Sequence, residues 1–274
     1  MRTDPGSGPV LDPQGPPLPT TQIMSQWWRD IAFLHWPVEP ALLAPLMPRG
    51  VRPDEFDGSA WVGLIPFRMV DAGVLRGGPV PWLGTFPETN VRIYSVDDRG
   101  RNGVVFLSLE ASRLLVVLGA RLGFNVPYQW ASMRVRDAVG AGTAEDVGAR
   151  GAGRADAPGR VLTYTTRRAT RSRVAGIGRP HSRISIRVGE PVTEPEPLDL
   201  FLTARFGLHT SVAGRSLWVP NTHGPWPLRR AEVLELDDDL VAAAGLGSFA
   251  RTTPPTSVLF SEGVRTTFGF PQHL

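Results

Sequence analysis

The 274-residue sequence contains no lysine, and all 29 of its basic residues are arginines. An amine that forms a Schiff base with a carbonyl substrate must be a lysine side chain or the N-terminus of the chain. Cysteine is also absent, which excludes disulfides, thiolate catalysis and cysteine-ligated zinc. The most apolar segment, Leu114 to Ala120, is far too short to span a membrane. These absences remove side-chain amine and thiol chemistry from consideration.

The N-terminal segment lacks the apolar stretch of a signal peptide and is rich in proline. We expect a disordered tail over residues 1–22, followed by a single domain over residues 23–274. A stretch rich in glycine and alanine predicts a flexible surface loop at about residues 138–159. We expect a cytoplasmic protein with no membrane partner, and the sequence leaves open whether it forms a homo-oligomer.

Turn-forming residues are abundant, since the chain has 30 glycines and 27 prolines. Their frequency predicts many short elements and a mainly β architecture of the α+β kind. Strands at 86–96 and 103–111 flank a turn sequence and predict one hairpin, and 160–173 with 181–188 predict another. Short helices are expected at 41–47, 112–121, 198–206 and 239–245. Many strands with short connections favour a single antiparallel β-barrel with a few short flanking helices.

Arginines are concentrated in one part of the sequence. Between Arg150 and Arg187 there are ten arginines and a single acid, Asp156, and acids gather afterwards at 190–199 and 232–239. A basic strip of this kind is compatible with nucleic-acid binding. It lacks interleaved aromatic residues and nucleic-acid motifs. We therefore favour ion pairs between these arginines and the two acidic clusters, and do not expect a nucleic-acid partner.

The most informative short segment is Glu88-Thr-Asn-Val-Arg-Ile-Tyr94. Strand alternation places its four polar or amphipathic residues on one face: Glu88, Asn90, Arg92 and Tyr94. That face is either a solvent-facing side over a core or the polar lumen of a barrel that holds a ligand. The pattern alone does not decide between the two.

A second segment, Gly119-Ala-Arg-Leu-Gly-Phe-Asn-Val-Pro-Tyr-Gln-Trp-Ala131, resembles the Gly-Arg-x-x-x-Gly-x-Pro-Lys-x-x-Ala segment of acetoacetate decarboxylase-like proteins. The chain is more closely similar to the uncharacterised bacterial YqjF-like family (domain of unknown function 2071). The stretches that carry this resemblance are Phe33–Pro37, Trp61–Phe67, Glu88–Tyr94, Val126–Tyr128, Phe201–Arg205, His223–Leu228 and Ser261–Val264. It covers about residues 27–271.

The resemblance implies a β-barrel of the acetoacetate decarboxylase-like type that encloses a pocket. In the decarboxylases a lysine after the proline forms a Schiff base with a β-keto acid, and a carboxylate assists. Tyr128 stands at the position of that lysine, and Glu88 matches the carboxylate. Because the chain has no lysine, the fold can be inferred from the decarboxylases but their Schiff-base reaction cannot.

Chemistry that needs no amine remains open. Arg92 or Arg121 could hold a carboxylate bidentately, while Glu88 could act as general base and Tyr128 as a donor to a carbonyl oxygen. The structural alternative pairs Arg121 with an acid and packs Tyr128 as a core aromatic. The expected catalytic pair is thus Glu88 and Tyr128, and the expected ligand-binding set is Asn90, Arg92, Tyr94 and Arg121.

No metal or other cofactor is expected. His35 and His223 lie in motif-like surroundings and could in principle bind a metal with Glu88, but their spacing does not support such a site. The sequence has no Walker loop and no Gly-x-Gly-x-x-Gly fingerprint. Ser261 lacks the strand-turn-helix elbow of a hydrolase nucleophile.

These observations favour a protein that binds a small carboxylate or carbonyl compound in a barrel pocket without Schiff-base chemistry. The first alternative is a lyase or hydrolase-like enzyme that uses Glu88 and Tyr128 as acid and base on a small keto acid. The second alternative is RNA or polyphosphate binding through the Arg160–Arg187 hairpin. The sequence does not name a ligand.

Overall fold

The computed structural model describes residues 12–18, 21–74, 84–113, 127–138 and 159–274. Its strands are β1 (Gln22–Val38), β2 (Val51–Pro53), β3 (Ala60–Val74), β4 (Phe86–Asp97), β5 (Asn102–Ala111), β6 (Tyr128–Ala138), β7 (Val161–Arg168), β8 (His181–Pro191), β9 (Gly207–Val212), β10 (Arg215–Thr222), β11 (Leu228–Asp238), β12 (Ser257–Gly269) and β13 (Gln272–His273). The short helices are α1 (Pro40–Leu43), η1 (Ala44–Leu46), α3 (Pro197–Thr203), η2 (Ala242–Leu246) and α4 (Phe249–Thr252). The predicted mainly β architecture is confirmed. None of the described helices has the length and hydrophobicity needed to cross a bilayer.

All 13 strands belong to one sheet of mixed orientation. Most neighbours are antiparallel, but β6 and β9 both run parallel to β5. The prediction of a purely antiparallel sheet is therefore wrong. Parallel neighbours need a crossover connection of about a dozen residues or more, and residues 112–127, between β5 and β6, are long enough to provide one.

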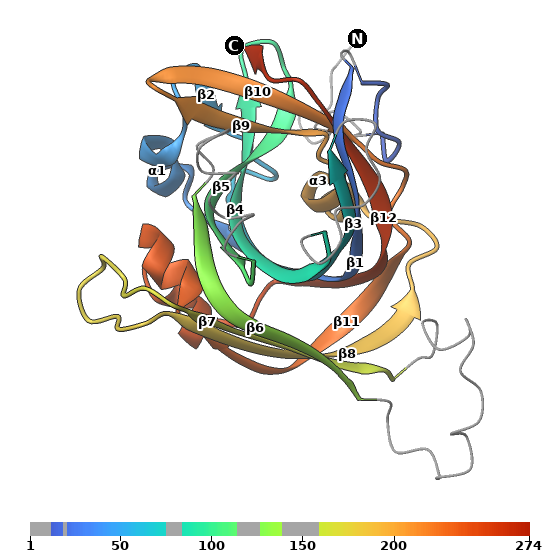
Figure 1. Cartoon of the computed structure of the whole chain (residues 1–274), viewed down its shortest axis with the longest axis vertical. Helices are drawn as coiled ribbons and strands as arrows, with labels where there is room; N and C mark the ends of the chain where they lie inside the picture. The colour runs from blue at the N-terminus through green and yellow to red at the C-terminus, as the bar shows by residue number, and fades with distance from the viewer. Residues whose placement is uncertain (1–11, 19–20, 75–83, 114–126, 139–158) are drawn as a thin grey trace.

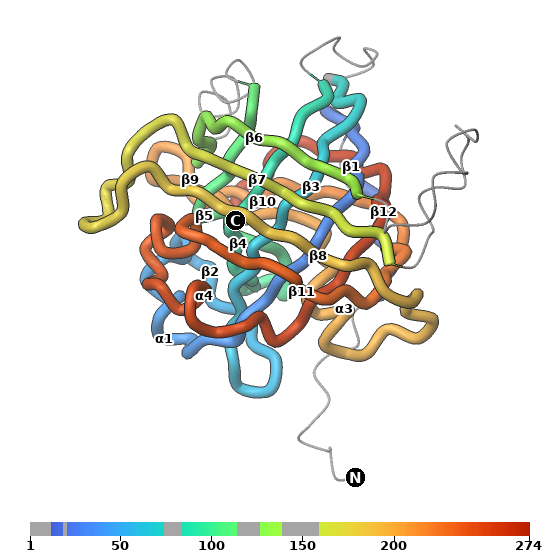
Figure 2. The backbone as a smooth tube through the Cα atoms, turned by 90° about the horizontal axis from the view of Figure 1, so that it is seen from below, coloured from blue at the N-terminus to red at the C-terminus, as the bar shows by residue number. Residues whose placement is uncertain are grey.

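The pairing of seven strands closes on itself. In order around the circuit these are β1, β3, β4, β5, β9, β10 and β12, and β12 pairs again with β1. We call this circuit the strand ring. Figure 1 looks into the ring, with β6, β7, β8 and β11 crossing below it. Figure 2 shows these four strands from below as a layer that lies across the ring.

Strands β1, β3 and β4 are buried on both faces. One hydrophobic cluster packs between the ring and the crossing layer and includes Leu34, Val91 and Ile186. A second cluster uses the opposite face of the same strands and includes Phe33 and Ile65. Successive side chains on these strands therefore enter different cores. Because both faces of β1 are buried, its sequence does not alternate between polar and apolar residues. Residues 27–36 are therefore recognisable in the sequence only as an aromatic-rich stretch.

Both predicted hairpins are confirmed. β4 pairs antiparallel with β5, and β7 with β8. In β8 the alternation predicted for residues 183–187 holds, since Ile184 and Ile186 are buried while Arg183 and Arg187 face outward. The two arginines form ion pairs of 2.8 Å and 2.5 Å with Glu235 and Glu232 on β11, which confirms the expected pairing of these arginines with an acidic cluster.

The helix predicted at 239–245 is observed as the short helix η2 (Ala242–Leu246). The backbone N–H of Val241 donates to the Asp238 carboxylate at 3.0 Å, whereas Asp239 is bound to His181 and Arg251. The side chain of Asp238 therefore accepts from the backbone near the start of this helix, while the Asp239 carbonyl accepts from the backbone N–H of Ala243. Other predictions lie outside the described residues: most of the tail, most of the helix at 112–121 with Arg121 in it, and most of the loop at 138–159.

Candidate ligand site on strand β4

The polar face of β4 is buried inside the strand ring. Glu88, Asn90 and Arg92 are 3%, 4% and 7% exposed, and Tyr94 is fully buried. Cross-strand neighbours on β3 confirm the orientation, because Phe67 lies opposite Glu88 and belongs to the hydrophobic cluster on that face. The interpretation of this face as a solvent-facing side is therefore wrong.

Tyr128, the first residue of β6, donates a 3.0 Å hydrogen bond to Oε2 of Glu88. The contact follows from the parallel pairing of β6 with the end of β5. Ala111 of β5 lies between the two strands, paired with Glu88 on one side and with Trp130 on the other. The structure thus brings together the two residues predicted as a catalytic pair, which are 40 positions apart in the sequence.

Burial makes Glu88 a weak acid. It raises the pKa of Glu88 from 4.5 to about 8, against the opposing effect of the Tyr128 hydrogen bond, and the nearby Glu110 raises this pKa further. Burial and the neighbouring Glu88 raise the pKa of Tyr128 well above its usual value of 10. Near neutral pH both groups therefore carry protons, and Glu88 is the one that can release its proton at mildly alkaline pH.

Behind Glu88, on the other face of the sheet, lies a buried ion pair. Arg168 of β7 donates to Oε1 of Glu110 through Nε at 3.0 Å and through Nη2, and the Ser108 hydroxyl donates to the same oxygen at 2.6 Å. Burial raises the pKa of Glu110, although Arg168 and these hydrogen bonds oppose the shift. The pair joins β5 to β7 and holds a carboxylate close enough to favour the protonated form of Glu88.

Neutral groups hold the guanidinium of Arg92. Its Nε and Nη2 donate to the Tyr94 hydroxyl at 3.2 Å and 3.1 Å, and Nη2 also donates to the Leu202 carbonyl at 3.1 Å. The ring of Phe33 lies 5.7 Å from its Cζ. Among the described residues no acidic side chain pairs with Arg92.

The undescribed segments could supply few counter-charges. Their acids are Asp4, Glu145, Asp146 and Asp156, and segments 75–83 and 114–126 contain none. Arg205, the other arginine near Tyr94, is different: its guanidinium is paired with Asp54 and donates through Nε to the Phe201 carbonyl at 2.6 Å. Within the described part of the chain, Arg92 is thus a buried cation without the carboxylate partner that buried charges ordinarily have.

The Tyr94 hydroxyl is fully used within the protein. It donates to the Leu202 carbonyl at 3.0 Å, so its oxygen accepts from Arg92 and from Nε2 of His35, which lies 2.5 Å away. Burial and the charges of Arg92 and Arg205 lower the pKa of His35 well below its usual value. His35 is therefore neutral and carries its proton on Nε2, and its Nδ1 has no hydrogen-bond partner among the described residues.

The structure places the predicted residues in two groups along one face. Glu88 and Tyr128 meet at the start of β4, Arg92 and Tyr94 lie further along it, and Asn90 is between them, with no described partner for its Oδ1. Sequence reasoning did not assign site roles to four participants: His35, Glu110, Leu202 and Arg205. Two of them offered a signal, since an acid in the apolar run 103–111 and a histidine in the apolar run 31–38 both indicate buried polar groups.

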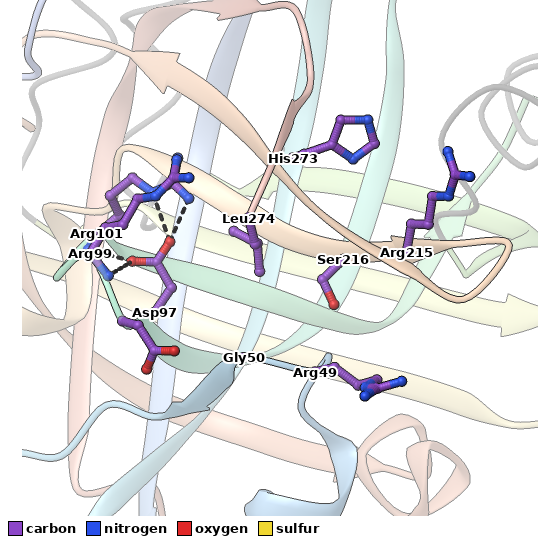
Figure 3. Close-up of a pocket in the computed structure, with 10 residues that line it drawn as sticks. Arg49, Gly50, Asp97, Arg99, Arg101, Arg215, Ser216, His273 and Leu274 are labelled. Carbon is purple, nitrogen blue, oxygen red and sulfur yellow. Dashed lines mark hydrogen bonds and ion pairs between the residues drawn. The ribbon is translucent and has the colours of Figure 1, made fainter.

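No group of three or more His, Asp or Glu side chains that could hold a metal occurs in the part of the chain that the structure describes. A hollow with a volume of about 420 Å³ lies near Asp97, at the opposite end of β4 from Glu88. None of the predicted site residues lines it, as Figure 3 shows. The interior group around Glu88 and Arg92 and this hollow are thus separate features.

The fold is that of the acetoacetate decarboxylase-like enzymes. One such enzyme, from Sphingomonas wittichii RW1, matches with a TM-score of 0.58 and 13% identity over 98% of both chains. The enduracididine biosynthesis enzyme MppR, in complex with pyruvate, matches with a TM-score of 0.58 and 16% identity over 97% of this chain and 98% of that one. At such identities the similarity shows the fold alone.

The chain belongs to the family DUF2071, described as an uncharacterized conserved protein, whose model matches residues 25–265. It is 31% identical over 213 residues to the uncharacterized protein YqjF of Bacillus subtilis strain 168, an alignment that covers 77% of this chain and 76% of that protein. The predicted family membership and the predicted relation to the decarboxylase fold are both confirmed.

Proposed function

We propose that this protein binds a small carboxylate inside the strand ring, which would then serve as the pocket-forming barrel expected from the resemblance. Arg92 is the anion-binding group, and the observation that carries the proposal is its buried guanidinium without a described acidic partner. A guanidinium of this kind matches a carboxylate bidentately. A ligand carboxylate would supply the counter-charge that none of the described residues places there.

The other end of the ligand faces the Glu88–Tyr128 pair. Glu88 and Arg92 are four residues apart on one face of a strand, roughly 13 Å between Cα atoms, and both side chains are buried. Protonated Glu88 can donate to a carbonyl oxygen, and Asn90 lies between the two ends. Tyr94, whose hydroxyl is already used, positions Arg92 rather than touching the ligand. MppR, which shares the fold, is described in complex with pyruvate.

Binding is tested with pyruvate and with methyl pyruvate, its uncharged ester, by thermal shift and calorimetry. We expect pyruvate or a related keto or hydroxy acid to stabilise the protein and the ester to have no effect. Arg92→Gln should weaken binding by about tenfold or more, since a charge-assisted hydrogen bond contributes about 1.5–3 kcal/mol. Arg187→Gln, an exposed arginine on β8, is the control. If no acid in the panel binds, or if Arg92→Gln binds as well as the parent, the proposal is wrong.

A second candidate function is an enzyme that removes a proton next to a carbonyl group. The pKa of Glu88 near 8 favours it, because a base works best when its pKa is close to the working pH. The proton on C3 of pyruvate would pass to the Glu88 carboxylate, and deuterium from solvent would replace it. Proton NMR in D₂O would follow this exchange. A rate that rises up to about pH 8 and disappears in Glu88→Gln supports the enzyme; binding without exchange leaves the binding function alone.

Nucleic-acid or polyphosphate binding through the Arg160–Arg187 hairpin has less support. Arg160 pairs with Asp30 and Asp137, and Arg168 with Glu110, while the two outward arginines of β8 pair with glutamates of β11. Weak or salt-insensitive retention on heparin would agree with our expectation that this segment is structural, whereas steeply salt-dependent retention would contradict it.

A further inference from the structure

The hollow near Asp97 is lined by residues from four separate parts of the chain. They are Arg49 and Gly50 before β2, Asp97, Asp98, Arg99 and Arg101 at the β4–β5 turn, Arg215 and Ser216 at the start of β10, and His273 and Leu274 at the end of the chain. Figure 3 shows these residues around a common opening. Four arginines against two aspartates give the lining an excess of positive charge, and none of these residues takes part in the interior site.

One wall of the hollow is held in place by Asp97. Its carboxylate accepts from the backbone N–H groups of Arg99 and Arg101 at 3.0 Å and 2.9 Å, and from Nε of Arg101 at 2.7 Å. Arg101 is also fixed by the Trp218 ring, 5.2 Å from its Cζ. Hydrogen bonds from Arg101 lower the pKa of Asp97 although burial opposes the shift. The charge of Asp97 is therefore committed to Arg101 and does not compensate the other arginines.

The remaining three arginines have no ion pair with any residue that the structure describes. Arg49, Arg99 and Arg215 are all exposed, and of the two lining aspartates Asp98 is the one not bonded to an arginine. Arg215 follows a tight turn in which Ala213 and Gly214 have φ values of 49° and 77°. A non-glycine residue with positive φ is uncommon, and this turn sets the direction of the Arg215 backbone beside the β4–β5 turn.

We propose that this hollow is a binding site for a small multivalent anion of the phosphate ester or pyrophosphate class. Arginine forks bind phosphate oxygens bidentately, and the volume of about 420 Å³ is within the range of small-molecule sites. The lining has no Phe, Tyr or Trp side chain on which a base could stack, which favours a compact anion over single-stranded nucleic acid. Three exposed arginines match two or more negative charges better than they match a monocarboxylate.

The site is tested by calorimetric titration with pyrophosphate, with inorganic phosphate and acetate for comparison. The full chain is used without a C-terminal tag, because Leu274 lines the hollow. We expect pyrophosphate to bind more tightly than phosphate, and acetate not to bind there. Arg99→Ala with Arg215→Ala should weaken pyrophosphate binding by about tenfold or more. Replacing the same two residues by lysine should restore part of the affinity, since the charge returns without the fork geometry.

Arg173→Ala with Arg179→Ala is the matched control, because it removes two exposed arginines from the connection between β7 and β8. This control should bind pyrophosphate as the parent does. Equal weakening in both double variants would mean that pyrophosphate responds only to overall charge, and would overturn the proposal. Absence of pyrophosphate binding to the parent would overturn it too. Thermal melting confirms that each variant is folded, and loss of binding in Arg92→Gln instead would assign the anion to the interior site.

Discussion

The hydroxyl of Tyr128 and the carboxyl group of Glu88 form a partly buried 3.0 Å hydrogen bond between β6 and β4. The sequence resemblance to acetoacetate decarboxylase-like proteins implies that Tyr128 stands at the position of their lysine, so a donor that keeps its proton would replace an amine there. Its partner is a carboxyl group whose pKa is near 8. The pair is therefore suited to hydrogen bonding and proton transfer, and not to covalent attachment of a carbonyl compound.

Glu88→Gln should change how stability depends on pH. The pKa of Glu88 is about 8 in the folded protein and near 4.5 in the unfolded chain, so the folded state binds this proton more tightly. As pH rises from about 4.5 to 8, the wild type loses stability by up to about 1.4 kcal/mol for each unit between the two pKa values. Glu88→Gln has no ionisable carboxyl group at this position and does not lose this stability. Relative to the wild type, its free energy of unfolding should therefore increase as pH rises.

Urea titrations at several pH values between 4.5 and 8.5 measure this difference. Glu232→Gln is the control, since it changes a carboxyl group that is exposed rather than buried. A Glu88→Gln curve parallel to that of the wild type throughout the range would contradict the raised pKa.

Tyr128→Phe should raise the pKa of Glu88 above about 8. The hydrogen bond from Tyr128 favours the ionised carboxylate and so lowers the pKa of Glu88. Without it, burial and Glu110, which both raise this pKa, are no longer opposed by Tyr128. The variant should also lose about 1 kcal/mol of stability with the hydrogen bond. NMR of labelled glutamate carboxyl carbons reads the titration directly. Tyr164→Phe is the matched control, because Tyr164 is a buried tyrosine whose hydroxyl donates to the Asp30 carbonyl at 2.7 Å. This substitution should leave the pKa of Glu88 unchanged.

The face that carries Glu88 and Arg92 could be predicted from strand alternation, because the period of two needs only local sequence. The burial of this face could not be predicted, because a strand with a polar face has the same sequence pattern whether that face meets water or packs inside the protein. The pairing of Tyr128 with Glu88 came only from the resemblance. It depends on the parallel pairing of β6 with β5, which no local sequence pattern encodes.

The Arg92 environment was even less accessible to sequence reasoning. His35, Tyr94 and Leu202 come from β1, β4 and α3, and their polar atoms converge only once the ring has closed. A charged residue in an apolar strand indicates a buried charge. Packing decides which groups surround that charge. Packing also explains why no carboxylate among the described residues pairs with it.

Glu110→Ala should be strongly destabilising, by about 3–5 kcal/mol, because it leaves the buried guanidinium of Arg168 without its carboxylate partner. Removing both charges in Glu110→Ala with Arg168→Met should cost less than the single change. Denaturant unfolding of the four proteins forms a double-mutant cycle. For comparison, Glu232→Ala removes a partner of the exposed Arg187 and should cost no more than about 1 kcal/mol. Additive effects at Glu110 and Arg168 would show that the two side chains do not stabilise the fold as a pair.

Gly63→Ala should disturb the Arg92 end of the site. A Cβ at this position would lie 3.1 Å from Cδ2 of His35 and 3.3 Å from Cγ of Arg92, closer than ordinary carbon contacts. Gly63 lies opposite Arg92 on β3, so its missing side chain provides the space in which His35 and Arg92 pack. The added methyl group should therefore cost about 1–3 kcal/mol of stability and displace the guanidinium from Tyr94.

Displacement of Arg92 should weaken pyruvate binding beyond what the loss of stability explains, which calorimetry at a temperature well below the melting transition would measure. Gly178→Ala is the control, since a Cβ there meets no atom within 4 Å, and it should alter neither stability nor binding. Unchanged pyruvate affinity in a folded Gly63→Ala protein would separate the ligand from Arg92, because bidentate carboxylate binding depends on the position of the guanidinium.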